Sequence, residues 1–248
     1  MRTIRLTVQY DGTDFSGFQV QVGKRTVQGE LETTVERVTD RPTRVVGAGR
    51  TDAGVHATGQ VVSFETTSGL DPSTLRRALN ARLPDDVVVV AASNAPPGFN
   101  ARFSARSREY RYTIWNAADR VAMGRAYVYH WRAFLDAPAM DEAARSLVGR
   151  HDFAAFAGAT RSAERSIDTV RTLFRLHCWR DGQKVIVQTA ADGFLTHMVR
   201  NLVGTLLQVG MHQATVGDVQ EILASRDRSR AGRTAPARGL CLTRVEYD

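Results

Sequence analysis

The amino-acid sequence predicts an α+β fold with largely antiparallel sheets, on three observations. The chain has 248 residues, enough for one large domain or two small ones. Segments with the period of strands and segments with the period of helices occur in both halves, without the strict strand–helix–strand alternation of a parallel sheet. Apolar residues make up 43% and charged residues 24% of the chain, which is typical of a globular protein and excludes a mostly disordered one.

The first half is expected to contain strands on either side of two helices. Apolar and polar residues alternate over 4–10, the pattern of a half-buried strand. Thr26 is a suitable N-cap for a helix that Pro42 ends. The further elements expected are short strands over 44–48 and 60–64, a helix opened by Asp71 and Pro72, and a buried strand over 87–90.

The second half repeats this mixture of elements. Tyr110, Tyr112 and Ile114 share one face of a predicted strand, and Thr215 and Asp218 have the spacing of a capping box. The other elements expected are a helix from Pro138, strands near 170–179 and 184–189 joined by a turn at 181–182, an apolar helix over 195–209, a helix over 216–223 and a strand over 240–245. The Pro-Pro-Gly segment at 96–98 predicts a boundary between domains 1–97 and 98–248.

The charge balance points to a polyanionic partner. Lys and Arg total 33 against 26 Asp and Glu, so the net charge is +7, and all but two of these cations are arginines. Guanidinium groups bind phosphates and stack on bases, so nucleic acid is one explanation. An arginine-rich codon usage with no functional meaning is the other.

Several classes of protein are excluded by what the sequence lacks. The longest apolar runs, such as 87–92, are far shorter than the ~18–20 residues of a membrane span, and the N-terminus has no signal-peptide core. Cys178 and Cys241 are the two cysteines, which argues against a disulfide framework or a cysteine-built zinc site. We therefore expect a cytoplasmic protein with no metal site and no membrane partner.

A glycine-rich loop at 47–57 carries the clearest chemical signal. Three glycines bracket Asp52, and Arg50 lies two residues before it. A nearby cation favours the ionised carboxylate, which is then a competent nucleophile. The glycine spacing fits neither a dinucleotide fingerprint nor a phosphate-binding P-loop. The alternatives are that Asp52 is an ordinary turn residue, and that His56 is structural instead of orienting Asp52.

Segment 49–57 (Gly-Arg-Thr-Asp-Ala-Gly-Val-His-Ala) resembles the catalytic motif of the tRNA pseudouridine synthase A family. The resemblance extends, in order, to segments 10–19, 99–105, 110–112, 151–153, 194–201 and 231–240. It covers nearly the whole chain. One departure is segment 209–213, which lacks the second glycine and the lysine that we expect there. This difference concerns a connecting loop and not the residues of the predicted chemistry.

The resemblance implies the pseudouridine synthase fold, two related halves with the active-site cleft between them. It implies isomerisation of uridine to pseudouridine at positions 38, 39 and 40 of the tRNA anticodon stem-loop. Asp52 would be the nucleophile, and attack at C1′, attack at C6 and assistance at C2′ all stay open. The reaction needs no redox cofactor, metal or ATP. The family also forms homodimers in which one tRNA touches both subunits.

Four further residues match site residues of the family. Arg200 corresponds to the basic partner of the catalytic aspartate, and Tyr110 to the tyrosine that stacks on or contacts the target uracil. Leu240 corresponds to an apolar residue of the uracil pocket, and Arg50 would help to extrude the base or hold flanking phosphates. Taken alone, Tyr110 and Leu240 fit ordinary core positions, and Arg200 fits a side chain at the edge of an apolar helix stripe.

Two sequence segments rich in arginine are candidate phosphate-binding tracks or simply solvated faces. They contain Arg102, Arg106, Arg108 and Arg111, and Arg226, Arg228, Arg230 and Arg233. Two other functions remain open. One is a catalytically silent tRNA-binding protein on the same scaffold, which the presence of both Asp52 and Arg200 disfavours. The other is a glycosidase that hydrolyses the nucleoside bond, which typically needs a second carboxylate.

Overall fold

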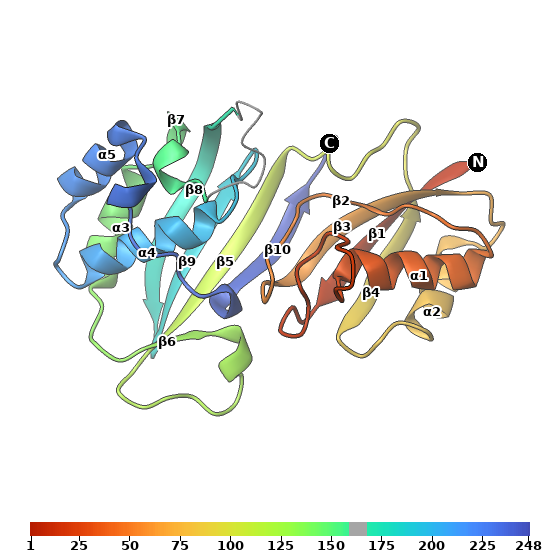
Figure 1. Cartoon of the computed structure of the whole chain (residues 1–248), viewed down its shortest axis with the longest axis horizontal. Helices are drawn as coiled ribbons and strands as arrows, with labels where there is room; N and C mark the ends of the chain where they lie inside the picture. Colours follow the sequence, from red (N-terminus) through yellow and green to blue (C-terminus); the bar gives the residue numbers. More distant parts are fainter. Residues whose placement is uncertain (159–167) are drawn as a thin grey trace. The chain divides into compact units, whose positions relative to one another are not determined.

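The computed structural model describes residues 1–158 and 168–248, and it divides into two compact units (Figure 1). Unit 1 contains Met1–Arg108 and Cys241–Asp248, and unit 2 contains Glu109–Leu240. This division differs from the boundary that we predicted after Pro97. Segment 99–106 is held on unit 1, where the Ala101 N–H donates to Ser63 Oγ at 3.0 Å and the Tyr247 hydroxyl donates to the Ala101 carbonyl at 2.8 Å.

The sheet of unit 1 has the strand order β4-β1-β3-β10, with the two-residue strand β2 (Val46–Gly47) on β3. The strands β1 (Arg2–Tyr10), β3 (His56–Thr66) and β4 (Val87–Asn94) pair antiparallel. The last strand, β10 (Leu240–Glu246), joins β3 in parallel through Leu242 and Ala57. This late pairing explains why the C-terminus belongs to unit 1.

Two helices of unit 1 begin at the predicted caps. Helix α1 (Val27–Thr39) starts after Thr26, whose side chain accepts from the Gly29 N–H. Helix α2 (Pro72–Asn80) starts after Asp71, whose carboxylate accepts from two backbone N–H groups. Short polar side chains satisfy the first free N–H groups of a helix in this way, so both starts are set locally.

The core of unit 1 lies between the sheet and these helices. Ile4, Leu6 and Val8 alternate along β1 and are fully buried, as are Leu31 of α1 and Leu75 of α2. The period-2 pattern therefore predicted the buried face of β1 correctly. The prediction that 87–90 forms a buried strand was wrong in one respect. β4 is the last strand of its sheet on this side, and Val88 and Val90 on its outer face are each 39% exposed.

Unit 2 has the strand order β5-β9-β8-β7, with the short strand β6 (Tyr129–Trp131) paired to β5. Its strands are β5 (Ser107–Asn116), β7 (Gly149–Asp152), β8 (Val170–Asp181) and β9 (Lys184–Ala191). β8 and β9 form the predicted hairpin, closed where Asp181 pairs with Lys184 and Gly182 has φ +56°. Glycine adopts this left-handed conformation without a steric penalty.

The helices of unit 2 are α3 (Ala137–Arg145), α4 (Met198–Gly210) and α5 (Val216–Ser225). Helix α4 begins three residues later than predicted, because His197 has φ +58° and ends the preceding turn. Helix α5 has the predicted capping box between Thr215 and Asp218. Short 3-10 turns cover Arg125–Tyr127, Ala154–Phe156, Arg228–Arg230 and Ala237–Gly239.

The predicted α+β class with largely antiparallel pairing is confirmed. The parallel exceptions among the pairs described above are β3 with β10 and β5 with β6. Cys178, which is buried, and Cys241 are free thiols. Within the described residues, none of the helices has the length and apolar character that a membrane crossing requires.

Candidate active site

Asp52 lies in the connection between β2 and β3 of unit 1. β3 begins at His56, earlier than the predicted Gln60, so the loop is shorter than we expected and its last motif residues belong to the strand. Asp52 is partly buried, and its carbonyl accepts from the Val55 N–H at 3.1 Å. The turn expected around Asp52 is therefore present, and a backbone hydrogen bond closes it.

A second loop, over residues 11–18, packs closely on the Asp52 loop. The Phe18 N–H donates to the Thr51 carbonyl at 3.0 Å. A side chain at Gly12 would place its Cβ 2.0 Å from the Val55 carbonyl oxygen, and Gly17 has φ +96° with the Thr51 carbonyl 2.9 Å from its Cβ position. Glycine is thus required at both positions, and the close packing fixes the backbone on each side of Asp52.

Polar side chains of β1 and β3 attach the Asp52 loop to the sheet by hydrogen bonds. The Tyr10 and Thr51 hydroxyl groups are hydrogen-bonded at 2.7 Å, and Gln60 Nε2 donates to the Gly49 carbonyl at 2.8 Å. Burial raises the pKa of the Tyr10 phenol far above its usual value, so that it stays neutral. Sequence reasoning did not single out Tyr10, Thr51 or Gln60, although Tyr10 and Thr51 belong to segments that carry the family resemblance.

His56 is buried and contacts the neighbouring loop. Its Nδ1 atom lies 3.0 Å from the Gly12 nitrogen, which donates to it, and 3.1 Å from an Asp11 carboxylate oxygen. The imidazole therefore fixes the segment that lies against the Asp52 loop. These contacts agree with the structural alternative that the sequence left open for His56.

Arg50 is exposed beside two other arginines of unit 1. Burial lowers the pKa of Arg50, and the positive charges of Arg102 and Arg44 lower it further. No ion pair with an acidic residue is found for these three arginines in the described part of the chain. We call Arg44, Arg50 and Arg102 the arginine cluster. Adjacent cations without acidic partners favour binding of a polyanion.

Tyr110 lies on β5 of unit 2 and is 7% exposed. Its ring meets the ring of Phe194 edge to face, with centroids 5.2 Å apart. Tyr112 and Ile114 share the buried face of the strand, as predicted. The aromatic pair holds the Tyr110 ring in one orientation, which suits either a core position or a stacking partner.

Arg200 projects from α4 and is fixed by the segment that follows α5. Its Nε donates to the Ala235 carbonyl at 2.7 Å, and the Ala235 N–H donates to the Arg200 carbonyl at 3.1 Å. Below this pair, the Thr234 hydroxyl and the Arg228 guanidinium both donate to the Asn201 side-chain oxygen. Arg200 therefore lies at the edge of an apolar helix stripe and is also hydrogen-bonded to a second segment of unit 2.

Two glycines allow the segment after α5, which contains Ala235, to approach α4 closely. A Cβ at Gly204 would lie 1.8 Å from the Arg233 carbonyl oxygen, and one at Gly232 would lie 2.4 Å from the Gly204 carbonyl oxygen. Segment 231–240 belongs to the family resemblance, but its role as a support for Arg200 was not visible in the sequence.

Leu240 is buried, with 5% exposure, at the end of the same segment. A Cβ at the preceding Gly239 would lie 2.6 Å from the Tyr112 ring, and the Tyr112 hydroxyl donates to the Pro236 carbonyl at 2.8 Å. Segment 236–240 therefore packs on β5, the strand that carries Tyr110.

The structure thus places the predicted site residues in two groups. Asp52 and Arg50 lie in one loop of unit 1, and Tyr110, Arg200 and Leu240 lie in unit 2. The expected pairing of Asp52 with Arg200 joins residues of different units and stays a prediction. No group of three His, Cys, Asp or Glu side chains that could hold a metal occurs among residues 1–158 and 168–248.

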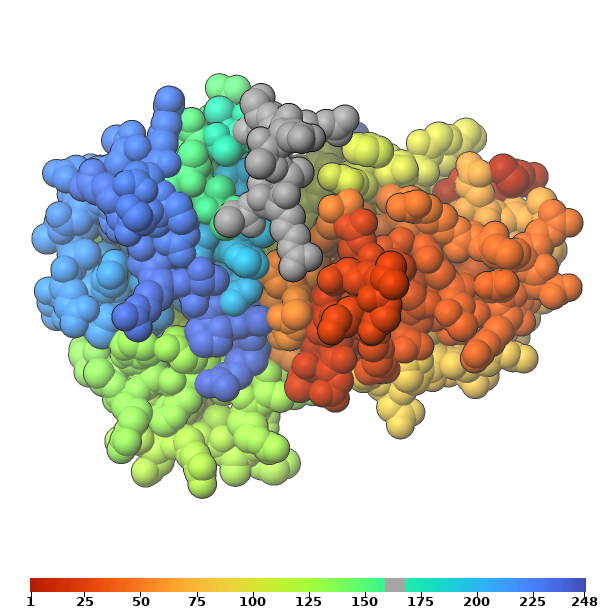
Figure 2. Space-filling model, viewed as in Figure 1, coloured from red at the N-terminus to blue at the C-terminus, as the bar shows by residue number. Residues whose placement is uncertain are grey.

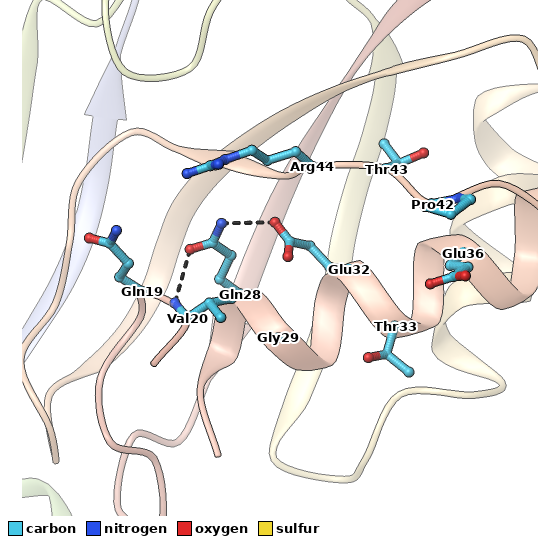
Figure 3. Close-up of a pocket in the computed structure, with 10 residues that line it drawn as sticks. All are labelled: Gln19, Val20, Gln28, Gly29, Glu32, Thr33, Glu36, Pro42, Thr43 and Arg44. Carbon is cyan, nitrogen blue, oxygen red and sulfur yellow. Dashed lines mark hydrogen bonds between the residues drawn. The ribbon is translucent and has the colours of Figure 1, made fainter. Parts of the chain in front are cut away.

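A surface cavity of unit 1 lies away from the Asp52 loop. A cavity of about 690 Å³ is bounded by loop residues near Gln19, by α1 and by segment 42–44 (Figure 3). Inside it, the Gln28 side chain accepts from the Val20 N–H and donates to Glu32 (Figure 3). The neighbouring residues 20–25 are exposed, and this part of the chain lies at the surface in Figure 2. Arg44 reaches this cavity, but Asp52 and Arg50 do not line it.

Comparison with known proteins identifies the family. The model of the tRNA pseudouridine synthase family matches residues 6–104 and 143–248. The tRNA pseudouridine synthase A of Geobacillus kaustophilus is 46% identical over 246 residues, which cover 99% of this chain and 94% of the relative. That of Chloroflexus aurantiacus is 51% identical over 251 residues and covers 100% and 89%. That of Methylobacterium nodulans is 47% identical over 248 residues and covers 100% and 96%.

These matches define the class of the protein as an isomerase, because pseudouridine is an isomer of uridine. The chain belongs to the tRNA pseudouridine synthase family. The resemblance stated from the sequence motifs is thereby confirmed.

Proposed function

We propose that this chain converts uridine to pseudouridine at positions 38, 39 and 40 of the tRNA anticodon stem-loop, with Asp52 as the nucleophile. The observation that carries the proposal is the Asp52 loop. Its backbone is fixed by close glycine contacts and by buried polar groups, and it carries one carboxylate, two residues after Arg50.

The reaction balances without an added group. The N1–C1′ bond breaks, the uracil turns, and a C5–C1′ bond forms in its place. The hydrogen at C5 leaves as a proton, and N1 takes up a proton, so product and substrate have the same composition. A carboxylate that adds to the substrate and leaves again fits this balance, because it is regenerated at the end.

Arg200 is proposed as the partner of Asp52. A guanidinium near a carboxylate favours its ionised form when the bound RNA excludes water. The pair of hydrogen bonds between Arg200 and Ala235 supports this role, because it orders the long side chain before substrate binds. Loss of either charge should then affect turnover more than binding.

Tyr110 and Leu240 are proposed to surround the target uracil. A base in an RNA stem must leave the stack before its reactive atoms can be reached, at a cost of a few kcal/mol. Stacking on an aromatic ring contributes roughly 1–3 kcal/mol per base and offsets this cost. The edge-to-face contact with Phe194 supports the proposal, because it holds the Tyr110 ring ready for stacking.

Arg50 is proposed to hold the phosphates next to the extruded uridine or to help to displace the base. Its exposure and its position two residues before Asp52 support this role. We further propose a cytoplasmic homodimer in which one tRNA touches both subunits. Sedimentation equilibrium measures the subunit number directly, and a monomer at micromolar concentration would contradict the dimer.

The function is tested with tRNA transcripts tritiated at uracil C5, with free uracil measured in the same samples. We expect tritium release without free uracil, because C5 loses its hydrogen when the new carbon–carbon bond forms. Transcripts in which uridines 38, 39 and 40 are replaced one at a time assign the positions. Free uracil would identify a glycosidase, and tight tRNA binding without tritium release would identify a silent binding protein.

A further inference from the structure

Phe103 is the exposed aromatic residue closest in sequence to the arginine cluster. It lies in segment 99–106 of unit 1, and its side chain is 80% exposed. The neighbouring Ala101 is fully buried. The segment therefore has an inner side that belongs to the core and an outer side that presents a phenyl ring to solvent.

Hydrogen bonds hold the backbone of this segment in place. The Asn100 side-chain oxygen accepts from the N–H groups of Arg102 and Phe103 at 3.0 and 3.2 Å. The Ser104 hydroxyl accepts from the Asn100 N–H at 3.1 Å, and the Ala101 N–H donates to Ser63. An exposed ring on a fixed backbone loses little conformational entropy when a flat partner binds to it.

One guanidinium connects this segment with the Asp52 loop. Arg108 donates from Nε and Nη2 to the Ala48 carbonyl, at 3.1 and 2.9 Å. It also donates to the carbonyls of Arg102 and Ala105. Ala48 immediately precedes the motif that contains Asp52, so Phe103 is displayed beside the candidate catalytic loop within the same unit.

The charges around Phe103 suit a nucleotide. The guanidinium carbon of Arg102 lies 5.5 Å from the centre of the Phe103 ring. The charge of Arg102 also lowers the pKa of Arg50, so a second cation of the arginine cluster lies within electrostatic reach of Arg102. By contrast, the nearby Arg106 is paired with Asp248. Aromatic rings with adjacent guanidinium groups bind unpaired bases and their phosphates.

We propose that Phe103 and Arg102 form a stacking surface for an unpaired nucleobase of the RNA substrate, separate from the uridine that is modified. Arg50 and Arg44 would bind phosphates beside that base. The proposal rests on the proposed function in one respect, that the substrate is RNA. It adds a second point of contact that helps to set which nucleotide reaches Asp52.

The test uses the full chain and an anticodon stem-loop RNA with 2-aminopurine placed at successive loop positions. Stacking on an aromatic ring changes the fluorescence of this base, and direct titration gives the affinity. We compare Phe103→Ala with Phe134→Ala. Phe134 is a matched control, because it is 74% exposed and also lies near a guanidinium, that of Arg180 at 5.1 Å.

Phe103→Ala should weaken RNA binding about tenfold and abolish the fluorescence change at one loop position. Phe103→Tyr should restore both, and Phe134→Ala should match the wild-type chain. Equal affinities for Phe103→Ala and Phe134→Ala would overturn the proposal. So would dissociation of a dimer by Phe103→Ala in sedimentation, because the ring would then belong to a subunit contact.

The outcomes also separate this inference from the proposed function. Binding and fluorescence do not depend on turnover, so they are measured equally well in a chain that releases no tritium. If no tritium is released but base stacking depends on Phe103, the result contradicts the isomerase at these positions and supports the stacking surface. If tritium is released but RNA binding does not depend on Phe103, the result supports the isomerase and contradicts the stacking surface.

Discussion

The residues around Asp52 allow two loops, over 11–18 and around Asp52, to pack closely against each other. Gly12 and Gly17 have no room for a side chain, and the Tyr10–Thr51 hydrogen bond joins the loop to β1. The sequence pointed to Asp52 through the glycines and Arg50 around it and, decisively, through the family resemblance of segment 49–57. It could not point to Gly12 against Val55, because that contact joins positions far apart in the chain.

The contact of Gly12 gives a first prediction. Gly12→Ala should lower the free energy of unfolding by about 1–3 kcal/mol, because its Cβ would overlap the Val55 carbonyl and force the loops apart. Urea denaturation measures this change. Gly69→Ala is the control, since no atom lies within 4 Å of its Cβ position, and its effect should stay within about 0.5 kcal/mol. Equal effects of the two substitutions would contradict the close approach.

Caps and alternating patterns at the scale of elements were predicted well because they are local. Thr26, Asp71 and the Thr215–Asp218 box each start the expected helix. The start of α4 was misplaced because the apolar pattern continues through Leu195, whereas His197 turns the backbone. A single residue in the left-handed conformation does not change the spacing of apolar residues, so the sequence pattern cannot predict it. The exposure of β4 depends on its place at the edge of the sheet, which is equally invisible in the sequence.

The contact between α3 and β8 gives a pH-dependent prediction. Burial opposes ionisation of Asp141, but hydrogen bonds from the Cys178 N–H and from His177, with the charges of His177 and Arg145, outweigh it and lower the pKa of Asp141. A carboxylate with a lowered pKa stabilises the fold above its unfolded pKa of about 3.9. That contribution is lost as the pH falls through the folded-state pKa.

Melting temperature measured from about pH 6 to about pH 3 tests this. The wild-type chain should lose stability more steeply below about pH 4 than Asp141→Asn, which has no carboxylate to protonate. Asp85→Asn is the control, because Asp85 is exposed, and its curve should follow the wild type. Parallel curves for wild type and Asp141→Asn would contradict a role for the ionised Asp141.

At the scale of the whole molecule, a chain with a net charge of +7 carries Asp52 on a loop whose backbone is held by close contacts. The two-part organisation was predictable from length and patterning, but the contact-based boundary at Arg108 and the return of β10 to unit 1 were not. Both depend on contacts of the C-terminal segment with distant parts of the chain, with β3 and with Ala101. The Asp52–Arg200 pair that the family resemblance implies depends on the two units together, and it remains a prediction that double substitution can test.

The net charge of +7 gives a prediction for RNA binding as a whole. Affinity for the anticodon stem-loop should fall linearly with salt on logarithmic axes, because phosphate contacts release bound counterions. Arg50→Gln should reduce the slope by about 0.7–0.9, the share of one phosphate. Arg37→Gln, an exposed position on α1, should leave it unchanged. An unchanged slope for Arg50→Gln would show that Arg50 makes no phosphate contact.

The most direct test of the account is tritium release from C5-labelled tRNA by Asp52→Asn, beside the wild-type chain and Asp85→Asn. The asparagine keeps the size of the side chain and removes its negative charge. The account predicts no release by Asp52→Asn, with tRNA binding within a few fold of wild type, and normal release by Asp85→Asn. Substantial release by Asp52→Asn would contradict the assignment of Asp52 as the nucleophile.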